Sequence, residues 1–127
     1  MKKIDLIILC GGKGKRLRSI TGPIPKILCN INNKPFIHYL LNNITRYNFN
    51  RIILSTGYQS SMIEKWLRKS KFYEKVEIIN EKKPLGTGGA IKFASQGSEF
   101  DKIIINGDTI IDINFKEFIN DSKYSDL

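Results

Sequence analysis

The first candidate for chemistry is a loop of glycines and cations near the start of the chain. Residues 11–16 read Gly-Gly-Lys-Gly-Lys-Arg and directly follow an apolar segment. Glycines allow backbone N–H groups to approach an anion, and the cationic side chains neutralise its charge. The loop therefore predicts phosphate binding. A plain strand-to-helix turn is the alternative, because the loop matches neither the GxGxxG fingerprint nor the GxxxxGK[ST] loop.

Two later loops combine small residues with a carboxylate. Glu81 precedes the run Pro-Leu-Gly-Thr-Gly-Gly at residues 84–89, and Asp108 follows Asn106 and Gly107. A carboxylate only accepts hydrogen bonds, so it suits groups that donate them. Each also has a simpler interpretation, since Glu81 is flanked by lysines as an exposed residue would be, and an aspartate after Asn-Gly is typical of a turn.

The elements that must position these loops follow from hydrophobic spacing, which alternates between the periods of strands and helices. Aliphatic runs predict strands at 4–9, 51–57, 76–79 and 102–105. Helical spacing begins at Pro35, which suits a first turn, and returns after 57 and at 89–94. Strands alternating with helices predict an α/β domain, with a doubly wound, mostly parallel sheet and helices on both faces.

The second of these helices has a candidate start signal. Ser61 and Glu64 form a capping-box pattern before Ile63, Trp66 and Leu67.

The predicted sheet explains why the three loops belong together. Ligands of doubly wound folds bind at the carboxyl ends of the strands. The three loops follow the first, third and fourth predicted strands, so we expect them to form one site.

Length, composition and charge limit the classes of protein to which the chain can belong. The chain has 127 residues, 41% of them hydrophobic, and a formal charge of +9. These values indicate a single soluble domain, with no apolar run long enough to cross a bilayer and no secretory signal. Residues 1–40 hold eight Lys/Arg and one acid. This basic front half favours an anionic ligand; a generally lysine-rich surface is the alternative cause of the total charge.

With two cysteines and one histidine, the chain has almost no candidate ligands for a zinc or haem site. Cys10 and Cys29 have no CxxC spacing, so we expect reduced thiols in a cytoplasmic protein. Cations near Cys10 would lower the pKa of its thiol. His38 is expected on the solvated side of its helix, and the aromatic residues at 66, 72 and 73 in a core rather than on a nucleic-acid surface.

Several motifs, in order, resemble the sugar-phosphate nucleotidyltransferases. The run 9–17, LCGGKGKRL, is close to that family's LAGGxGTRL, with Cys10 and Lys15 as departures. Pro25-Lys26 and Lys34-Pro35 follow, then matches at 52–58, 84–91 and 106–109. The run 18–20 is closer to the heptose 1-phosphate branch, which supplies sugar nucleotides for capsule or lipopolysaccharide. The resemblance covers residues 4 to about 115 and implies a Rossmann-like nucleotidyltransferase fold.

The resemblance implies attack of a sugar 1-phosphate on the α-phosphate of a nucleoside triphosphate, which releases pyrophosphate. Such chemistry needs positioning and charge stabilisation rather than a protein nucleophile. Arg16 matches the residue that holds the triphosphate and the departing pyrophosphate, and Lys26 the lysine that reaches the reacting phosphates. Asp108 matches the aspartate that binds Mg²⁺, the expected cofactor. A solvated lysine and a turn aspartate are the structural alternatives for the last two.

Further residues match nucleotide-binding positions of the family. Glu81 falls where relatives read the base, and a carboxylate suits the two adjacent donors of guanine, which favours GTP over UTP or dTTP. The remaining nucleotide-binding residues implied by the motifs are Leu9, Gly11, Gly12, Lys13, Gly14, Gly86, Thr87, Gly88 and Gly107.

The same resemblance implies that residues 1–127 form only the nucleotide-binding N-terminal part of such a domain. The family's second metal-binding carboxylate lies in a downstream segment, and Asp112 comes too soon after Asp108 to replace it. Three hypotheses follow: a sugar 1-phosphate guanylyltransferase, a truncated nucleotide-binding module with little catalysis, and a small basic nucleic-acid-binding domain. We favour the first, with a nucleoside triphosphate and a sugar 1-phosphate as partners, no nucleic acid and no membrane. An open sheet edge could drive association of copies.

Overall fold

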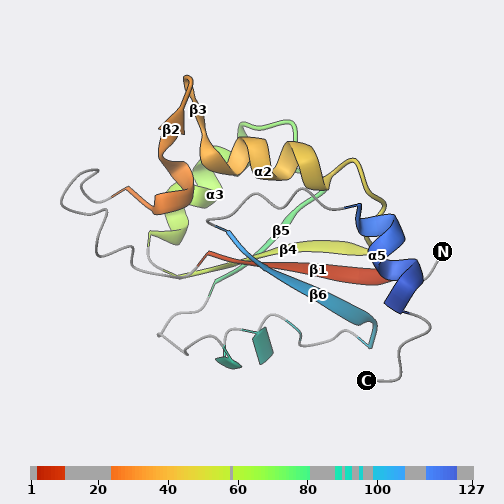
Figure 1. Cartoon of the computed structure of the whole chain (residues 1–127). Coiled ribbons are helices and arrows are strands. Elements are labelled where there is room, and N and C mark those ends of the chain that lie inside the picture. The colour runs from red at the N-terminus through yellow and green to blue at the C-terminus, as the bar shows by residue number, and fades with distance from the viewer. Residues whose placement is uncertain are drawn as a thin grey trace.

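Four parallel strands form the centre of the fold. The computed structural model describes residues 3–10, 24–57, 59–80, 88–89, 91–92, 95, 99–107 and 114–122. Within these, the sheet has the order β5-β4-β1-β6, and all three pairings are parallel (Figure 1). The strands are β1 (Ile4–Leu9), β4 (Arg51–Thr56), β5 (Glu77–Asn80) and β6 (Asp101–Asn106). Each predicted strand is confirmed to within one or two residues.

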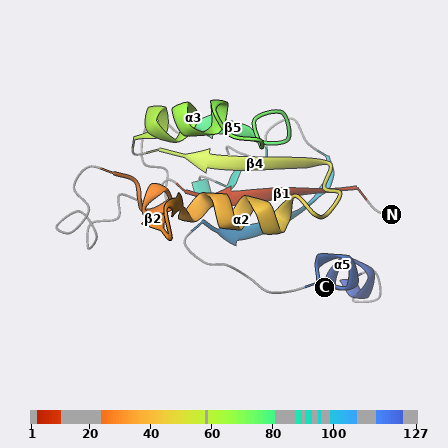
Figure 2. The same ribbon diagram turned by 90° about the horizontal axis from the view of Figure 1, so that it is seen from above.

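The helices cover the sheet from two sides. The helix α2 (Phe36–Ile44) and the helix α3 (Ser60–Arg68) lie on one side, and the helical residues 88, 89, 91 and 92 lie on the other (Figure 1). Viewed from above, α2 and α3 both lie over the strands, with β4 visible between them, and α5 (Phe115–Ser122) lies outside the sheet on the side of α2 and β6 (Figure 2). This arrangement confirms the predicted α/β class with a parallel sheet covered on both faces.

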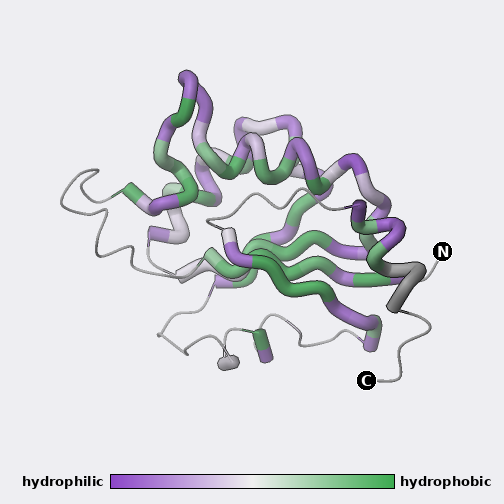
Figure 3. Tube along the Cα trace, in the orientation of Figure 1, coloured by the Kyte–Doolittle hydropathy of each residue, from purple (hydrophilic) through white to green (hydrophobic). Residues whose placement is uncertain are grey.

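Alternating side chains divide the strands between two apolar layers. The larger layer contains Leu6 and Ile8 of β1 and Leu54 of β4, all fully buried against α2 and α3. The smaller layer, on the opposite face, is centred on Ile7 and Ile53, which are also fully buried. Strands buried on both faces have continuous apolar runs, as Figure 3 shows at the centre of the sheet.

The helix α2 contributes one apolar face to the larger layer. Its buried residues are Ile37, Leu40, Leu41 and Ile44, at the spacing of a single helical stripe. Pro35 lies one residue before the helix rather than in its first turn.

The start of α3 corrects a sequence prediction. The helix begins at Ser60, its N-cap is Gln59 in a left-handed conformation (φ 54°), and no side chain caps it. The capping box of Ser61 and Glu64 is therefore wrong. Glu64 instead pairs with Arg68 one turn later, at 2.7 Å.

A short hairpin before α2 was not predicted. Its strands are β2 (Asn30–Ile31) and β3 (Lys34–Pro35), joined by Asn32 and Asn33 with φ of 49° and 69°. Two consecutive left-handed residues are typical of the tight turns that fit the twist of a hairpin, and asparagine tolerates this conformation. The Tyr39 hydroxyl of α2 donates a hydrogen bond to the Ile31 carbonyl at 2.6 Å and holds the hairpin against the helix.

Aromatic rings attach α5 to the rest of the fold. Phe115 is 1% exposed and meets Tyr47 and Phe49 edge-on, with ring centroids 5.1 and 5.5 Å apart. Phe118, one turn later, is exposed. In the described part of the chain, no helix has the length and apolar character needed to cross a membrane.

Candidate functional site

The carboxyl ends of three strands meet at one edge of the sheet. Leu9, the last residue of β1, is in register with Ser55 of β4 and with Asn106 of β6. Just beyond it, the Cys10 N–H donates to the Ser55 carbonyl at 2.8 Å, and the Gly107 N–H donates to the Leu9 carbonyl at 2.9 Å. Cys10 and Gly107, the last described residues before positions 11 and 108, therefore lie side by side at this edge.

Lys26 is held at the same edge by the residues on either side of it. It begins the 3₁₀ turn η1 (Lys26–Leu28), in which Pro25 and Ile27 are buried while Lys26 is exposed. The Leu28 N–H closes the turn by donating to the Pro25 carbonyl at 2.9 Å. Ile27 Cγ2 lies 3.3 Å from the point that a Cβ on Gly107 would occupy. The turn carrying Lys26 thus packs against the residue that precedes Asp108.

Gly107 is a glycine because three segments converge on it. A Cβ there would lie 3.0 Å from the Leu9 carbonyl oxygen and 3.1 Å from Cys10 Sγ. Its backbone is not left-handed, so the requirement is close approach rather than conformation. The packing of β1, η1 and β6 against one another depends on this absent side chain.

The thiol of Cys10 differs from the sequence prediction. Burial raises the pKa of Cys10 to about 12, because desolvation disfavours the thiolate. The prediction of a lowered pKa is therefore wrong. The thiol donates a weak hydrogen bond to the Ile8 carbonyl at 3.5 Å and acts as a small apolar group in the core. Both cysteines are free, as predicted.

Leu9 and Ile79 line the edge on the face opposite α2 and α3. Both belong to the smaller apolar layer, and both are partly exposed. Gly88, on a helical segment, is exposed and has no atom within 4 Å of its Cβ position, so packing does not explain the glycine there.

The other predicted site residues lie outside the described residues. They are Gly11, Gly12, Lys13, Gly14, Arg16, Glu81, Gly86, Thr87 and Asp108. Among the residues that are described, no three His, Cys, Asp or Glu side chains form a group that could hold a metal ion. Of the candidate site, the structure places Leu9, Lys26, Gly88 and Gly107, and brings Leu9, Gly107 and the turn of Lys26 into contact.

Buried hydroxyls at the end of β4 were missed by the sequence analysis. Thr56 Oγ1 and Ser60 Oγ are 2.7 Å apart, and both residues are buried where β4 leads into α3. Ser55 is 1% exposed. The sequence does show a polar Ser-Thr pair at the end of an aliphatic strand. Whether each hydroxyl is buried and bonded depends on which element packs against it, and the sequence does not show that.

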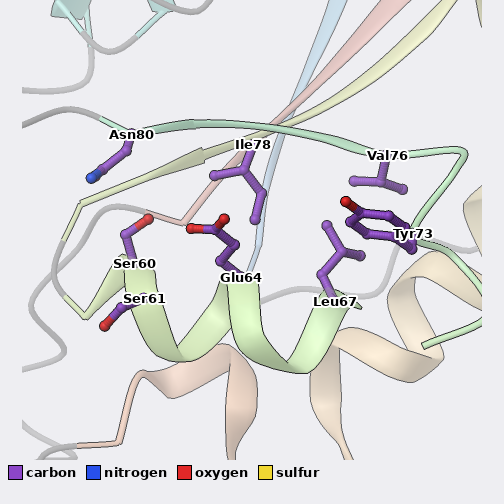
Figure 4. Close-up of a pocket in the computed structure, with 8 residues that line it drawn as sticks. All are labelled: Ser60, Ser61, Glu64, Leu67, Tyr73, Val76, Ile78 and Asn80. Atoms are coloured by element: carbon purple, nitrogen blue, oxygen red, sulfur yellow. The ribbon is translucent and has the colours of Figure 1, made fainter. Parts of the chain in front are cut away.

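A groove between α3 and β5 was also not predicted. It measures about 380 Å³ and is lined by Ser60, Ser61, Glu64, Leu67, Tyr73, Val76, Ile78 and Asn80 (Figure 4). Ile78 and Asn80 face α3, on the side of the sheet opposite Ile79. The groove therefore lies on the other face from the Leu9–Ile79 surface.

The structure also shows the surroundings of His38, Phe72 and Tyr73, which the sequence analysis considered and set aside as site residues. His38 is half-buried and meets the rings of Tyr39 and Phe72 edge-on, so the prediction of a solvated histidine is only partly right. Burial and the positive charges of Lys34 and Lys71 lower its pKa. Phe72 is a core residue as expected, whereas Tyr73 is exposed.

Comparison with known proteins connects this geometry to a family. A family model described as nucleotidyl transferase matches residues 5–126. The D-glycero-alpha-D-manno-heptose 1-phosphate guanylyltransferase of Aneurinibacillus thermoaerophilus is 41% identical over 115 residues, which are 90% of this chain and 50% of that protein. The enzyme of the same name from Campylobacter jejuni is 37% identical over 94% of this chain and 55% of its own length.

Solved structures agree with the sequence comparison. HddC from Yersinia pseudotuberculosis superimposes with a TM-score of 0.85 at 44% identity, over 96% of this chain and 55% of that one. Its complex with GMP-PN gives a TM-score of 0.82. The chain spans about half the length of the curated relatives it matches. Because the family model covers almost all of its residues, the chain belongs to the nucleotidyl transferase family.

Proposed function

We propose that this chain supplies the nucleotide-binding part of an enzyme that transfers a guanylyl group from GTP to heptose 1-phosphate. The observation that carries the proposal is the meeting of β1, η1 and β6 at one sheet edge, where Leu9 and Gly107 share a hydrogen bond of 2.9 Å. In sequence, the segment of Arg16 follows Leu9 and Asp108 directly follows Gly107. The similarity to heptose 1-phosphate guanylyltransferases supports the choice of substrates.

In the proposed reaction, an oxygen of the sugar 1-phosphate attacks the α-phosphate of GTP. The new bond joins that oxygen to the α-phosphorus, and the bond from the α-phosphorus to the bridging oxygen breaks and releases pyrophosphate. Lys26, exposed on its turn, would neutralise the reacting phosphates, and Arg16 would hold the triphosphate through its planar guanidinium. Gly11, Gly12 and Gly14 would present backbone N–H groups to phosphate oxygens.

Asp108 is the residue that would hold Mg²⁺, a hard cation that supplies charge neutralisation to the phosphates when bound. In sequence it directly follows Gly107, which is buried at the edge of the sheet. The donor type suits the ion, since Mg²⁺ is commonly held by one or two carboxylates together with substrate phosphates.

Base selection is assigned to Glu81. Its carboxylate would accept hydrogen bonds from the two donors on the Watson–Crick edge of guanine. The complex of the similar Yersinia protein with GMP-PN supports a guanine nucleotide.

The test is release of pyrophosphate by the 127-residue chain with GTP, heptose 1-phosphate and Mg²⁺. Turnover would show that this chain alone is an enzyme. GTP binding without turnover would remove that claim and leave a nucleotide-binding part, and the absence of both would refute the proposal. Arg16→Ala should weaken GTP binding, Asp108→Asn should abolish the response to Mg²⁺, and Glu81→Gln should reduce the preference for GTP over UTP.

A further inference from the structure

Two exposed lysines face His38, the one histidine of the chain. Lys34 lies four residues before it in β3, and Lys71 belongs to the turn that follows α3. Partial burial and the positive charges of both lysines lower the pKa of His38. Three segments thus bring their nitrogen-bearing side chains to one place beside α2.

Contacts with α2 and with an aromatic ring hold Lys71 in this place. Its Nζ donates a hydrogen bond to Asn42 Oδ1 at 2.9 Å, and Asn42 lies one turn after His38 on α2. The same Nζ lies 5.3 Å from the centroid of the Phe72 ring, and His38 meets that ring edge-on at 5.6 Å. The ammonium group and the imidazole are therefore held around one ring without a ligand.

Within the described residues, no carboxylate balances this charge. Neither Lys34 nor Lys71 forms an ion pair there, and the titratable groups that face His38 are these two lysines and Tyr39. Like charges that lie together repel each other, and an anion between them removes the repulsion. The ammonium groups and the imidazole would donate N–H groups to its oxygens. The cluster therefore has the charge and the donors that an oxyanion needs.

We propose that Lys34, His38 and Lys71 form a separate anion site, which binds the phosphate group of a small molecule outside the nucleotide site. The inference does not rest on the proposed function, because none of these residues belongs to the sheet edge of Leu9 and Gly107. A bound phosphate group favours the imidazolium, since an opposite charge nearby stabilises the charged form. Binding should therefore raise the pKa of His38, and by linkage the anion should bind more tightly as the pH falls.

The experiment follows the ring protons of His38 by NMR while the pH is varied. The chain has one histidine, so these signals need no further assignment. The titration is made in sodium pyrophosphate, in glucose 1-phosphate, and in sodium chloride of equal ionic strength. Pyrophosphate should raise the pKa of His38 by roughly 1 more than chloride does, the lower end of what a nearby opposite charge produces. The phosphate compound with the larger effect identifies the form of phosphate group that the site takes.

Lys34→Gln and Lys71→Gln test the site, and Lys65→Gln, at an exposed lysine of α3, is the matched control. Without an anion, each site variant should have a higher His38 pKa than wild type, since one repelling charge is gone. Each should also lose most of the response to pyrophosphate, whereas the control keeps it. All three lysines are exposed, so the variants should fold as the wild type does, which thermal unfolding checks.

Two outcomes would overturn this inference. Equal effects of pyrophosphate and chloride on the wild-type chain would mean that salt only screens the lysines. Equal responses of Lys34→Gln, Lys71→Gln and the control would mean that the anion binds elsewhere. Neither outcome bears on the proposed function, which depends on GTP. A chain that binds no GTP but shows the His38 response would contradict the proposed function alone.

Discussion

Replacing Gly107 with alanine tests the convergence of β1, η1 and β6 directly. The added Cβ would lie 3.0 Å from the Leu9 carbonyl oxygen, 3.1 Å from Cys10 Sγ and 3.3 Å from Ile27 Cγ2. The same Leu9 oxygen accepts the Gly107 N–H at 2.9 Å, so any shift that relieves the clash weakens this hydrogen bond. Two of the three contacts involve a backbone oxygen or the buried Cys10 thiol, which have little room to move.

The expected magnitude combines two opposing effects. Overpacking of a tight site costs about 1–3 kcal/mol. Alanine reduces the conformational entropy of the unfolded chain, which returns roughly 0.4–1 kcal/mol. Gly107→Ala should therefore lower the free energy of unfolding by about 1–2 kcal/mol, equivalent to a Tm lower by roughly 4–8 °C in a domain of this size.

Gly88→Ala is the matched control. Gly88 is exposed in a helical segment and nothing lies within 4 Å of its Cβ position, so only the entropic gain and the higher helix propensity remain. This variant should be more stable than wild type by up to about 1 kcal/mol. Urea unfolding followed by circular dichroism measures both variants. If Gly107→Ala were as stable as Gly88→Ala, the described packing of β1, η1 and β6 would be wrong.

Three further predictions concern the core, one titrating group and one thiol. Phe115→Ala should cost about 3–5 kcal/mol in urea unfolding, because it removes a ring packed against two others, whereas Phe118→Ala at an exposed position should stay within about 0.5 kcal/mol; similar losses would contradict the docking of α5. His38 has a lowered pKa, so the unfolded chain takes up its proton first as the pH falls below about 6.5. Stability should therefore drop through that window and level off below the folded pKa, and His38→Gln should show a smaller drop in pH-dependent melting. Cys10 is buried and its pKa is raised to about 12, so in the folded protein it should resist alkylation by iodoacetamide at pH 8 while Cys29 reacts. Equal alkylation rates of the two cysteines, measured by mass spectrometry, would refute the burial of Cys10.

Local patterns accounted for most of the secondary structure. The strand at 4–9 was predicted with its observed bounds, and the apolar stripe of α2 was read from its spacing, because both depend on side chains within one segment. The predicted start of α3 was wrong because it depends on contacts outside the local pattern. Ser61 and Glu64 have the right spacing for a capping box, but Thr56 binds Ser60 and Arg68 binds Glu64, and these contacts compete with the local signal.

The sequence predicted which loops belong to the candidate site, but not how the residues at the sheet edge pack against one another. Sequence motifs identified Lys26 and Gly107 as functional candidates, and the rule for parallel sheets placed Gly107, but not Lys26, at the carboxyl edge of the sheet. It could not show that Ile27 and Cys10 close around Gly107, or that the same burial raises the pKa of Cys10. Proximity to cations in sequence suggested the opposite direction, and desolvation decided the outcome.

The sequence by itself determined the order of strands and helices, the apolar faces and the family, because hydrophobic period and motif spacing are properties of neighbouring residues. Only the tertiary structure decided the strand order β5-β4-β1-β6, which puts β4 between the strand ending at Leu9 and the strand leading to Glu81. That order depends on pairing between segments far apart in the chain, and no local pattern encodes it. It is the reason why Ser55 pairs with Leu9 on one side and with Ile79 on the other, while its neighbour Thr56 hydrogen-bonds to Ser60 on the opposite face.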